Sequence, residues 1–380
     1  MKALFVGSDQ TIFDYESPAR KRLRTYASHI GELHVLARSG MGHVPYEQDS
    51  TEKRLFIYGA RSSKLFVPFI FSRYAHKLID THHIDIVSAH DPFEYGWAAA
   101  RAVKGTNAKL HIQVHTDYLS PWFTRNRIFR SPNVRMPFLN GIRIRIAHNV
   151  LTNADGIRTV SKRVKDSMLA RYGNAIPEPS VVPDCGPVEI PPKTELPPRP
   201  FTFTLVTVNR LKPEKRIPDL LAVLKRLKDV YPMIGLVIIG EGPERKRLER
   251  LTTKWGLSEH VLFLGWRADA WGLVQDAQAY IQASAYEGYG LSLIKAALAG
   301  IPIITSDVGV VGEVFIGYEH VFAAPVGDPT NLAALTAQLI EDPHARTLLS
   351  IEAKRVAHDH LETYKDQPAL IAADLQRLIT

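Results

Sequence analysis

Short apolar runs alternate with amphipathic stretches along the whole chain. This alternation is typical of βαβ units, in which helices connect parallel strands across a sheet. In the first half we expect strands at 3–6, 33–36, 84–88, 110–114, 157–160 and 181–182. In the second half we expect them at 203–208, 235–239, 261–264, 279–282, 303–305 and 321–323. Helical periodicity is clearest at 217–230, 244–255 and 331–339.

This pattern predicts an α/β protein with two Rossmann-like domains. A chain of 380 residues exceeds one ordinary core, because domains usually hold about 100–200 residues. Residues 186–200 contain six prolines and no periodic apolar pattern, which predicts a stiff linker. We therefore expect an N-terminal domain at 1–190 and a C-terminal domain at 200–365.

The composition is that of a globular protein in a reducing compartment. Apolar residues make up 45% of the chain and charged residues 23%, which is ordinary for such proteins. No apolar stretch is long enough to span a membrane, and the first residues do not resemble a signal peptide. Cys185 is the single cysteine, so neither an internal disulfide nor a cysteine-based zinc site is expected. A cytoplasmic location fits these features.

The excess positive charge belongs to the first half of the chain. The net charge is +8, and residues 1–190 hold 26 Lys and Arg against 17 Asp and Glu, whereas the rest holds 21 against 22. A basic half suits an anionic partner, such as a membrane surface or a phosphorylated acceptor, or it serves solubility alone. We expect no nucleic-acid partner, because the chain contains no recognised nucleic-acid module.

The densest chemical signal lies at 285–307, AYEGYGLSLIKAALAGIPIITSD. Glu287 precedes Gly288, Tyr289 and Gly290, and a helical stretch begins at Leu291. Glycines before a helix let the backbone approach a ligand, and the free N–H groups at a helix start favour an anion. On its own this signal is weak.

A second element, VNRLKPEK at 208–215, follows the first expected strand of the second domain. Ligands of open α/β sheets bind at the carboxyl ends of strands, so this loop can reach one. Arg210 and Lys215 can offer a guanidinium and an ammonium to one diphosphate. Taken alone, they are better described as two solvated surface cations.

Together these elements resemble glycosyltransferase family 4, the retaining, metal-independent transferases of the GT-B fold. The matching stretches are VNRLKPEKRIPDLL, LVIIGEGPERKRLERL, VLFLGW, 285–309 and 310–314, with looser matches at 89–92, 112–115, 159–162 and 182–184. The resemblance implies two parallel sheets facing a central cleft, and a C-terminal helix at 366–380 that rejoins the first domain. It also implies a UDP- or GDP-hexose donor, a glycan or lipid-linked acceptor, and no cofactor.

The resemblance further implies residue roles. Arg210 and Lys215 would hold the donor diphosphate, Glu287 would accept hydrogen bonds from sugar hydroxyls, and His115 would touch the transferred sugar. The other expected donor-binding residues are Gly240, Glu241, Gly265, Trp266, Gly288, Tyr289, Gly290, Leu291 and Lys295. Without the resemblance, His115 at the end of a strand would be read as a structural residue.

Two positions depart from the family pattern. The family carries a second glutamate eight positions after the first, and here that position is Lys295. An ammonium cannot accept hydrogen bonds from ribose hydroxyls. The alternative to an active enzyme is therefore a catalytically weakened subunit that binds a nucleotide sugar or a glycan. The first loop, at 7–16, also lacks the glycine pair of many relatives.

Basic and aromatic residues interleave in the first domain. Residues 118–154 contain no acidic side chain, and basic residues also crowd 20–24 and 61–77. Basic amphipathic segments with aromatics can lie in a membrane interface, so we expect peripheral binding to the inner face of the cell membrane. The residues expected at the acceptor or membrane are Arg20, Arg24, Arg61, Lys64, Arg125, Arg127 and Arg130. The alternative is that the aromatics are core and the arginines flank them.

Overall fold

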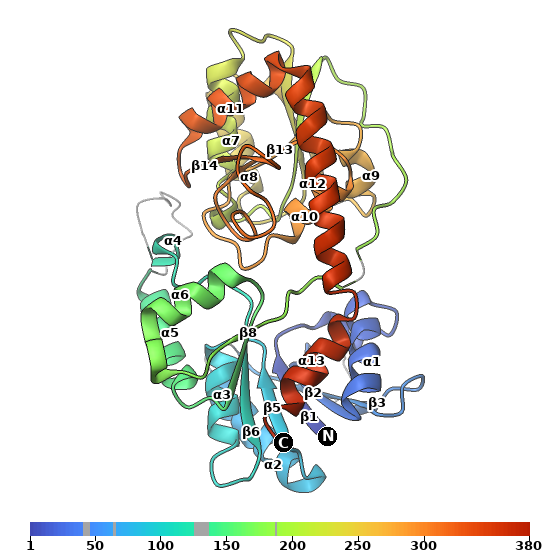
Figure 1. Cartoon of the computed structure of the whole chain (residues 1–380), viewed down its shortest axis with the longest axis vertical. Helices are drawn as coiled ribbons and strands as arrows, with labels where there is room; N and C mark the ends of the chain where they lie inside the picture. The colour runs from blue at the N-terminus through green and yellow to red at the C-terminus, as the bar shows by residue number, and fades with distance from the viewer. Residues whose placement is uncertain (41–45, 64–65, 125–136, 187) are drawn as a thin grey trace. The chain divides into compact units, whose positions relative to one another are not determined.

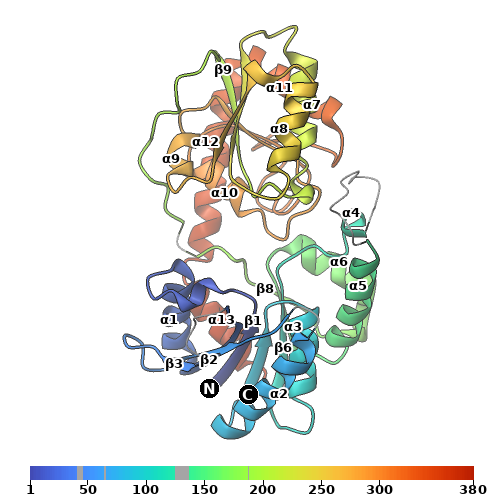
Figure 2. The ribbon, with the colours of Figure 1, turned by 180° about the vertical axis from the view of Figure 1, so that it is seen from behind.

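The computed structural model describes residues 1–40, 46–63, 66–124, 137–186 and 188–380 (Figures 1 and 2). The chain divides into two compact units. Of the described residues, those up to 186 and those at 366–380 form the N-terminal unit, and those at 188–365 form the C-terminal unit. In the described residues, no helix is both long enough and apolar enough to cross a membrane.

The N-terminal unit is built on a sheet with strand order β3-β4-β2-β1-β5-β6-β7-β8. Its strands are β1 (Lys2–Gly7), β2 (Glu32–Arg38), β3 (Tyr46–Gln48), β4 (Leu55–Ala60), β5 (Ile86–Ala89), β6 (Lys109–Val114), β7 (Gly156–Thr159) and β8 (Ser180–Val181). Its helices are α1 (Pro18–Ile30), α2 (Val67–His82), α3 (Glu94–Ala102), α4 (Pro121–Thr124), α5 (Pro137–Leu151), α6 (Lys162–Tyr172) and α13 (Gln367–Gln376). All neighbouring strands are parallel except β3 and β4.

Helices cover both faces of this sheet, which is why its strands are almost continuously apolar. Leu4 and Val6 of β1 pack into a core with α2 and α3. Ala3 and Phe5, which point to the opposite face, pack with α1 and α13. Figures 1 and 2 both show α13 beside α1, although the two helices come from opposite ends of the chain.

The C-terminal unit contains a parallel sheet with strand order β11-β10-β9-β12-β13-β14. Its strands are β9 (Phe203–Val208), β10 (Ile234–Ile239), β11 (Val261–Gly265), β12 (Ala279–Gln282), β13 (Ile303–Ser306) and β14 (Phe322–Ala324). Its helices are α7 (Ile217–Leu227), α8 (Arg245–Lys254), α9 (Ala270–Val274), α10 (Leu291–Leu298), α11 (Pro329–Glu341) and α12 (Pro343–Thr363). Leu205, Leu224 and Leu335 belong to the core on the face that α7 and α11 cover.

All twelve strands expected from the sequence are present, displaced by no more than two residues at their ends. The short edge strand β3 and its partner β4 were not expected. Part of the predicted linker is held by backbone hydrogen bonds. The Thr194 N–H donates to the Gly272 carbonyl at 3.0 Å, and the Leu196 N–H donates to Asp276 at 3.1 Å. Residues 192–196 therefore pack against the C-terminal unit at α9.

Candidate functional site

The sheet of the C-terminal unit reverses its winding between β9 and β12. Strands β10 and β11 continue from β9 on one side, and β13 and β14 continue from β12 on the other. Because all pairs are parallel, the loops that follow these strands emerge on one edge. In open α/β sheets, this switch point outside the carboxyl ends is where ligands bind.

Two loops meet at the switch point. The Ala285 N–H, after β12, donates to the Glu214 carbonyl, after β9, at 2.7 Å. Lys215 Nζ lies 2.5 Å from Glu287 Oε1, and these side chains are only 13% and 15% exposed. The structure thus brings together a predicted diphosphate-binding cation and the predicted sugar-binding carboxylate.

Gln282, the last residue of β12, orients Glu287. Its Nε2 donates to Glu287 Oε1 at 3.4 Å. Its Oε1 accepts from Ser292 Oγ at 2.7 Å and from the Tyr280 hydroxyl at 3.2 Å. Burial raises the pKa of Tyr280. With its oxygen bonded to these hydroxyls, the Gln282 amide directs its N–H group toward the carboxylate.

Glycines fix the backbone that carries Glu287. Gly290 has φ +98° just before α10, in the left-handed region that glycine tolerates best. Gly309 has φ +59°, and a Cβ there would lie 2.3 Å from the Tyr289 carbonyl oxygen. The Val310 N–H donates to that oxygen at 2.8 Å. The loop after β13 therefore holds the loop of Glu287 in place.

The glycines predicted near the nucleotide allow the neighbouring loops to pack closely against one another. Gly240 has φ +136°, and a Cβ there would meet the Asn209 carbonyl oxygen at 1.9 Å. Its N–H donates to the Gly265 carbonyl at 2.7 Å, and the Leu211 N–H donates to the Glu241 carbonyl at 2.9 Å. The loops after β9, β10 and β11 are thus tied together along the edge.

The remaining predicted donor residues differ in their exposure and in what they contact. Trp266 follows Gly265 and is 74% exposed. Arg210 is exposed in the loop of Lys215, and its side chain makes no hydrogen bond or ion pair with the described residues. Lys295, on α10, lies with its Nζ 5.8 Å from the centre of the Trp271 ring of α9. Burial lowers the pKa of Lys295.

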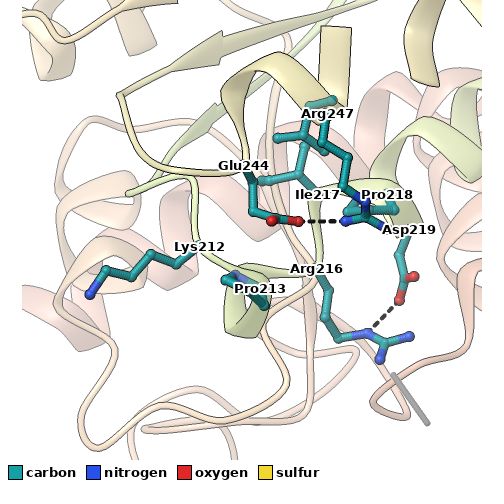
Figure 3. A pocket seen from close by; sticks show the side chains of 9 residues that line it. Lys212, Pro213, Arg216, Ile217, Pro218, Asp219, Glu244 and Arg247 are labelled. Carbon is teal, nitrogen blue, oxygen red and sulfur yellow. Dashed lines mark hydrogen bonds and ion pairs between the residues drawn. The ribbon is translucent and has the colours of Figure 1, made fainter. Parts of the chain in front are cut away.

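A shallow hollow adjoins the same loop (Figure 3). It lies at the N-terminal ends of α7 and α8, and two ion pairs line it, Arg216 with Asp219 at 2.7 Å and Arg247 with Glu244. Lys212 also lines it and extends away from both pairs in Figure 3. Lys215 and Glu287 are not among its lining residues, so the hollow is a separate feature.

The N-terminal unit has its own switch point, between β1 and β5. A Cβ on Gly7, the last residue of β1, would lie 3.0 Å from Nδ1 of His90, which follows β5. His115 follows the next strand, β6, and its ring centre lies 6.0 Å from that of His90. His115 Nδ1 lies 3.7 Å from Asp184 Oδ2. Burial lowers the pKa of His90 to about 4 and also lowers the pKa of His115.

The predicted residue His115 therefore shares an edge with His90 and Asp184, which were not expected as site residues. Both stand in stretches that resemble the family, and both follow a strand end, which was the available signal.

Arg20 and Arg24 were expected at an acceptor or a membrane, and the structure corrects this. Arg20 is fully buried, with ion pairs of 2.7 Å to both Asp49 and Glu47. Arg24 reaches the same Asp49 at 3.0 Å and lies over the Tyr15 ring. Asp49 is 29 residues away from Arg20, so local sequence gave no sign of this buried pair.

Exposed apolar and basic residues also lie along one face of α2, beginning just before its first turn. Phe66, Phe69 and Ile70 are 60%, 49% and 39% exposed. Arg73 and Lys77 are exposed on the same helical face, one and two turns further on. We call these five residues the α2 face. Arg61 is exposed, and Phe71 is buried in the core. Lys64, Arg125, Arg127 and Arg130 lie outside the described residues.

Within the described ranges, one group of side chains is close enough to hold a metal ion, namely Glu32, His34 and His82. Both nitrogens of His34 already have partners, Glu32 at 2.8 Å and the Tyr58 hydroxyl at 2.9 Å. Glu32 begins β2, so the group lies at the amino ends of the strands, away from the edge of His115.

Comparison with known proteins agrees with this arrangement. The family model "Glycosyltransferase Family 4" matches residues 23–185, and "Glycosyl transferases group 1" matches residues 192–356. A glycogen synthase of Mycobacterium tuberculosis is 31% identical over 199 residues, which cover 52% of this chain and 48% of that protein. The match thus spans about half the length of that curated relative.

Two solved structures share the fold over nearly the whole chain. Sucrose-phosphate synthase from Thermosynechococcus elongatus superimposes with a TM-score of 0.77 at 16% identity, covering 100% of this chain and 99% of that one. Anabaena Alr3699/HepE in complex with UDP-glucose gives 0.71 at 19% identity, covering 98% and 99%. The two parallel-sheet units are those of the GT-B fold. The chain belongs to glycosyltransferase family 4.

Proposed function

We propose that this protein is a retaining glycosyltransferase that moves a hexosyl group from a UDP- or GDP-hexose to a glycan or lipid-linked acceptor. The observation that carries the proposal is the Lys215–Glu287 pair at the switch point of the C-terminal unit. A diphosphate placed there would meet an ammonium, and the sugar beside it would meet a carboxylate. The Anabaena protein of similar fold was solved in complex with UDP-glucose.

The proposed reaction breaks the bond between the sugar and the diphosphate. Negative charge grows on the departing phosphate oxygen, and Lys215, joined by the exposed Arg210, stabilises it. Glu287 accepts hydrogen bonds from sugar hydroxyls and positions the ring. The acceptor hydroxyl attacks the face from which the diphosphate leaves, so the configuration is retained, and its proton passes to the phosphate oxygen. In this scheme side-chain cations neutralise the phosphate without a metal.

A screen of nucleotide sugars tests the proposal. A ligand that binds the folded chain raises its melting temperature, so one UDP- or GDP-hexose should stabilise the protein more than the other donors. NMR should then show slow release of the sugar in its original anomeric form, because water replaces the acceptor. If no donor both binds and is cleaved, the proposal is wrong.

Lys295 motivates a second candidate, a weakened subunit that binds a nucleotide sugar or a glycan. Its ammonium is half-buried over Trp271 and cannot accept a ribose hydrogen bond. The Lys295→Glu variant separates the two candidates. Gain of donor affinity and turnover would support a weakened wild-type site. Loss of turnover would support an active site adapted to lysine.

The α2 face supports a peripheral position at the inner face of the cell membrane. Exposed phenylalanines can enter the interface, and the neighbouring cations attract anionic lipid. The double variant Phe66→Ser/Phe69→Ser should lose binding to anionic vesicles at low salt. The matched control is Leu348→Ser/Ile351→Ser, an equally exposed apolar pair on α12. Failure of the wild type to bind at low salt would end this part of the proposal.

A further inference from the structure

Polar side chains run through the interior of the N-terminal sheet, where apolar residues are usual. Ser88 of β5, His111 and Gln113 of β6, and Arg158 of β7 are all buried. They connect the C-terminal helix α13 to the edge where His115 lies. Buried polar groups cost stability unless they are hydrogen-bonded, so their bonds should be fully matched.

In this row of buried side chains, each hydrogen bond has one donor and one acceptor, and the assignment is consistent from Arg158 to Asp374. Arg158 Nη1 can only donate, and it lies 2.7 Å from Gln113 Oε1. Gln113 Nε2 therefore faces Ser88 Oγ, to which it donates at 2.9 Å. The Ser88 hydroxyl then donates to His111 Nδ1 at 2.8 Å. His111 Nε2 donates to Asp374 Oδ2 of α13 at 3.0 Å.

Arg158 itself is held rigidly. Its Nε donates to the Val182 carbonyl at 2.9 Å and its Nη2 to the Pro183 carbonyl at 3.3 Å. The guanidinium is planar and always charged, so it cannot turn an acceptor toward Gln113. A flipped Gln113 amide would place N–H groups against this cation. The orientation of Gln113 is thus determined by Arg158.

The consequence falls on His115, whose Nε2 lies 3.2 Å from Gln113 Oε1. That oxygen is an acceptor, so a hydrogen on Nε2 completes the bond. If the ring carried its hydrogen on Nδ1 alone, the lone pair of Nε2 would face a lone pair of Gln113 Oε1. We propose that Arg158 and Gln113 are positioning residues that hold the neutral His115 ring as its Nε2–H tautomer. Burial and the Arg158 cation lower the pKa of His115 by more than the nearby Asp184 carboxylate raises it, which agrees with a neutral ring.

This tautomer gives the edge a defined chemistry. Nδ1 is left as an acceptor 3.7 Å from Asp184 Oδ2, a second acceptor. Two neighbouring acceptors favour a ligand group that donates a hydrogen bond, such as a sugar hydroxyl. This last step rests on the proposed function, whereas the tautomer does not.

Nitrogen NMR of the whole chain labelled at histidine reads the tautomer directly, because protonated and unprotonated ring nitrogens resonate far apart. The spectrum of His115→Asn identifies the His115 signals. The wild type is expected to show a hydrogen on Nε2 and none on Nδ1. A hydrogen on Nδ1 alone would overturn the inference, and this result is read from the wild-type chain.

Two variants of Gln113 separate positioning from packing. Gln113→Glu keeps an acceptor for Arg158 and His115, so the tautomer should persist. Gln113→Met keeps the length but removes the acceptor, so both tautomers should appear, and kcat/KM should fall about fivefold, the effect of one lost hydrogen bond. An unchanged tautomer in folded Gln113→Met would refute the role of Gln113. If the tautomers behave as expected and no donor is cleaved, the proposed function fails while this inference stands.

Discussion

Replacing Lys215 by methionine removes the cation at the switch point and preserves most of its length. In the structure its Nζ lies 2.5 Å from Glu287 Oε1, in a position where both side chains are mostly buried. After the change, Glu287 keeps one weak side-chain hydrogen bond among the described residues, from Gln282 at 3.4 Å. The variant therefore leaves a carboxylate nearly unpaired and also withdraws the charge that would meet the donor phosphate.

The unpaired carboxylate affects stability, and the missing cation affects catalysis, so the two effects can be measured separately. Removing one partner of a buried pair costs about 3–5 kcal/mol, and the bond retained from Gln282 brings our expectation to about 2 kcal/mol. For a unit of this size, that is a fall of about 5 °C in melting temperature. Loss of an electrostatic group that acts in the transition state lowers kcat about 10²- to 10³-fold.

Melting curves and donor cleavage are compared for Lys215→Met, Glu287→Gln and the double variant. The double variant should regain most of the lost stability, because no charge is left unpaired, but it should remain inactive. Lys212→Met, in the same loop but outside the pair, should retain stability and activity. Turnover of Lys215→Met within roughly tenfold of wild type, a barrier change of only about 1.4 kcal/mol, would refute the reasoning.

Three further outcomes follow from individual contacts. Gly309→Ala should lower kcat and destabilise the fold by about 1–3 kcal/mol, because its Cβ would lie 2.3 Å from the Tyr289 oxygen; unchanged kinetics would contradict this. Ser17→Ala should cost about 1 kcal/mol in urea unfolding, since Ser17 Oγ caps α1. Burial raises the pKa of Asp49, but the Glu52 N–H and Arg20 hold it below the ordinary 3.8. The stability that Asp49 adds is therefore full above about pH 4 and is lost as the pH falls below that value. The difference in the free energy of unfolding between the wild type and Asp49→Asn should be smaller at pH 3 than at neutral pH, and an unchanged difference would contradict this.

The sequence predicted best those features that follow from local pattern. Each expected strand was a short apolar run, and each donor-site loop followed such a run, so parallel pairing placed Lys215 and Glu287 on one edge. The same logic placed His115 at the edge of the other sheet. Such predictions need only the period of the pattern and the rule that ligands bind at carboxyl ends.

Other features depend on partners that are distant in the sequence. Arg20 resembled a surface cation because nothing nearby marks Asp49 as its partner. Strand β4 pairs with β2, which lies more than twenty residues earlier in the chain. Its short apolar run stands between polar stretches and was not predicted as a strand. Gln113 and Arg158 did carry a signal, since a polar residue within a buried strand requires a partner. Identifying that partner required the sheet order.

The most direct test of the central claim is where a diphosphate binds. A crystal structure of the chain grown with UDP should place phosphate oxygens about 2.7–3.2 Å from Lys215 Nζ, with the Lys215–Glu287 pair opened or shared. UDP bound elsewhere, for example in the hollow beside Arg216 and Arg247, with that pair undisturbed, would contradict the account.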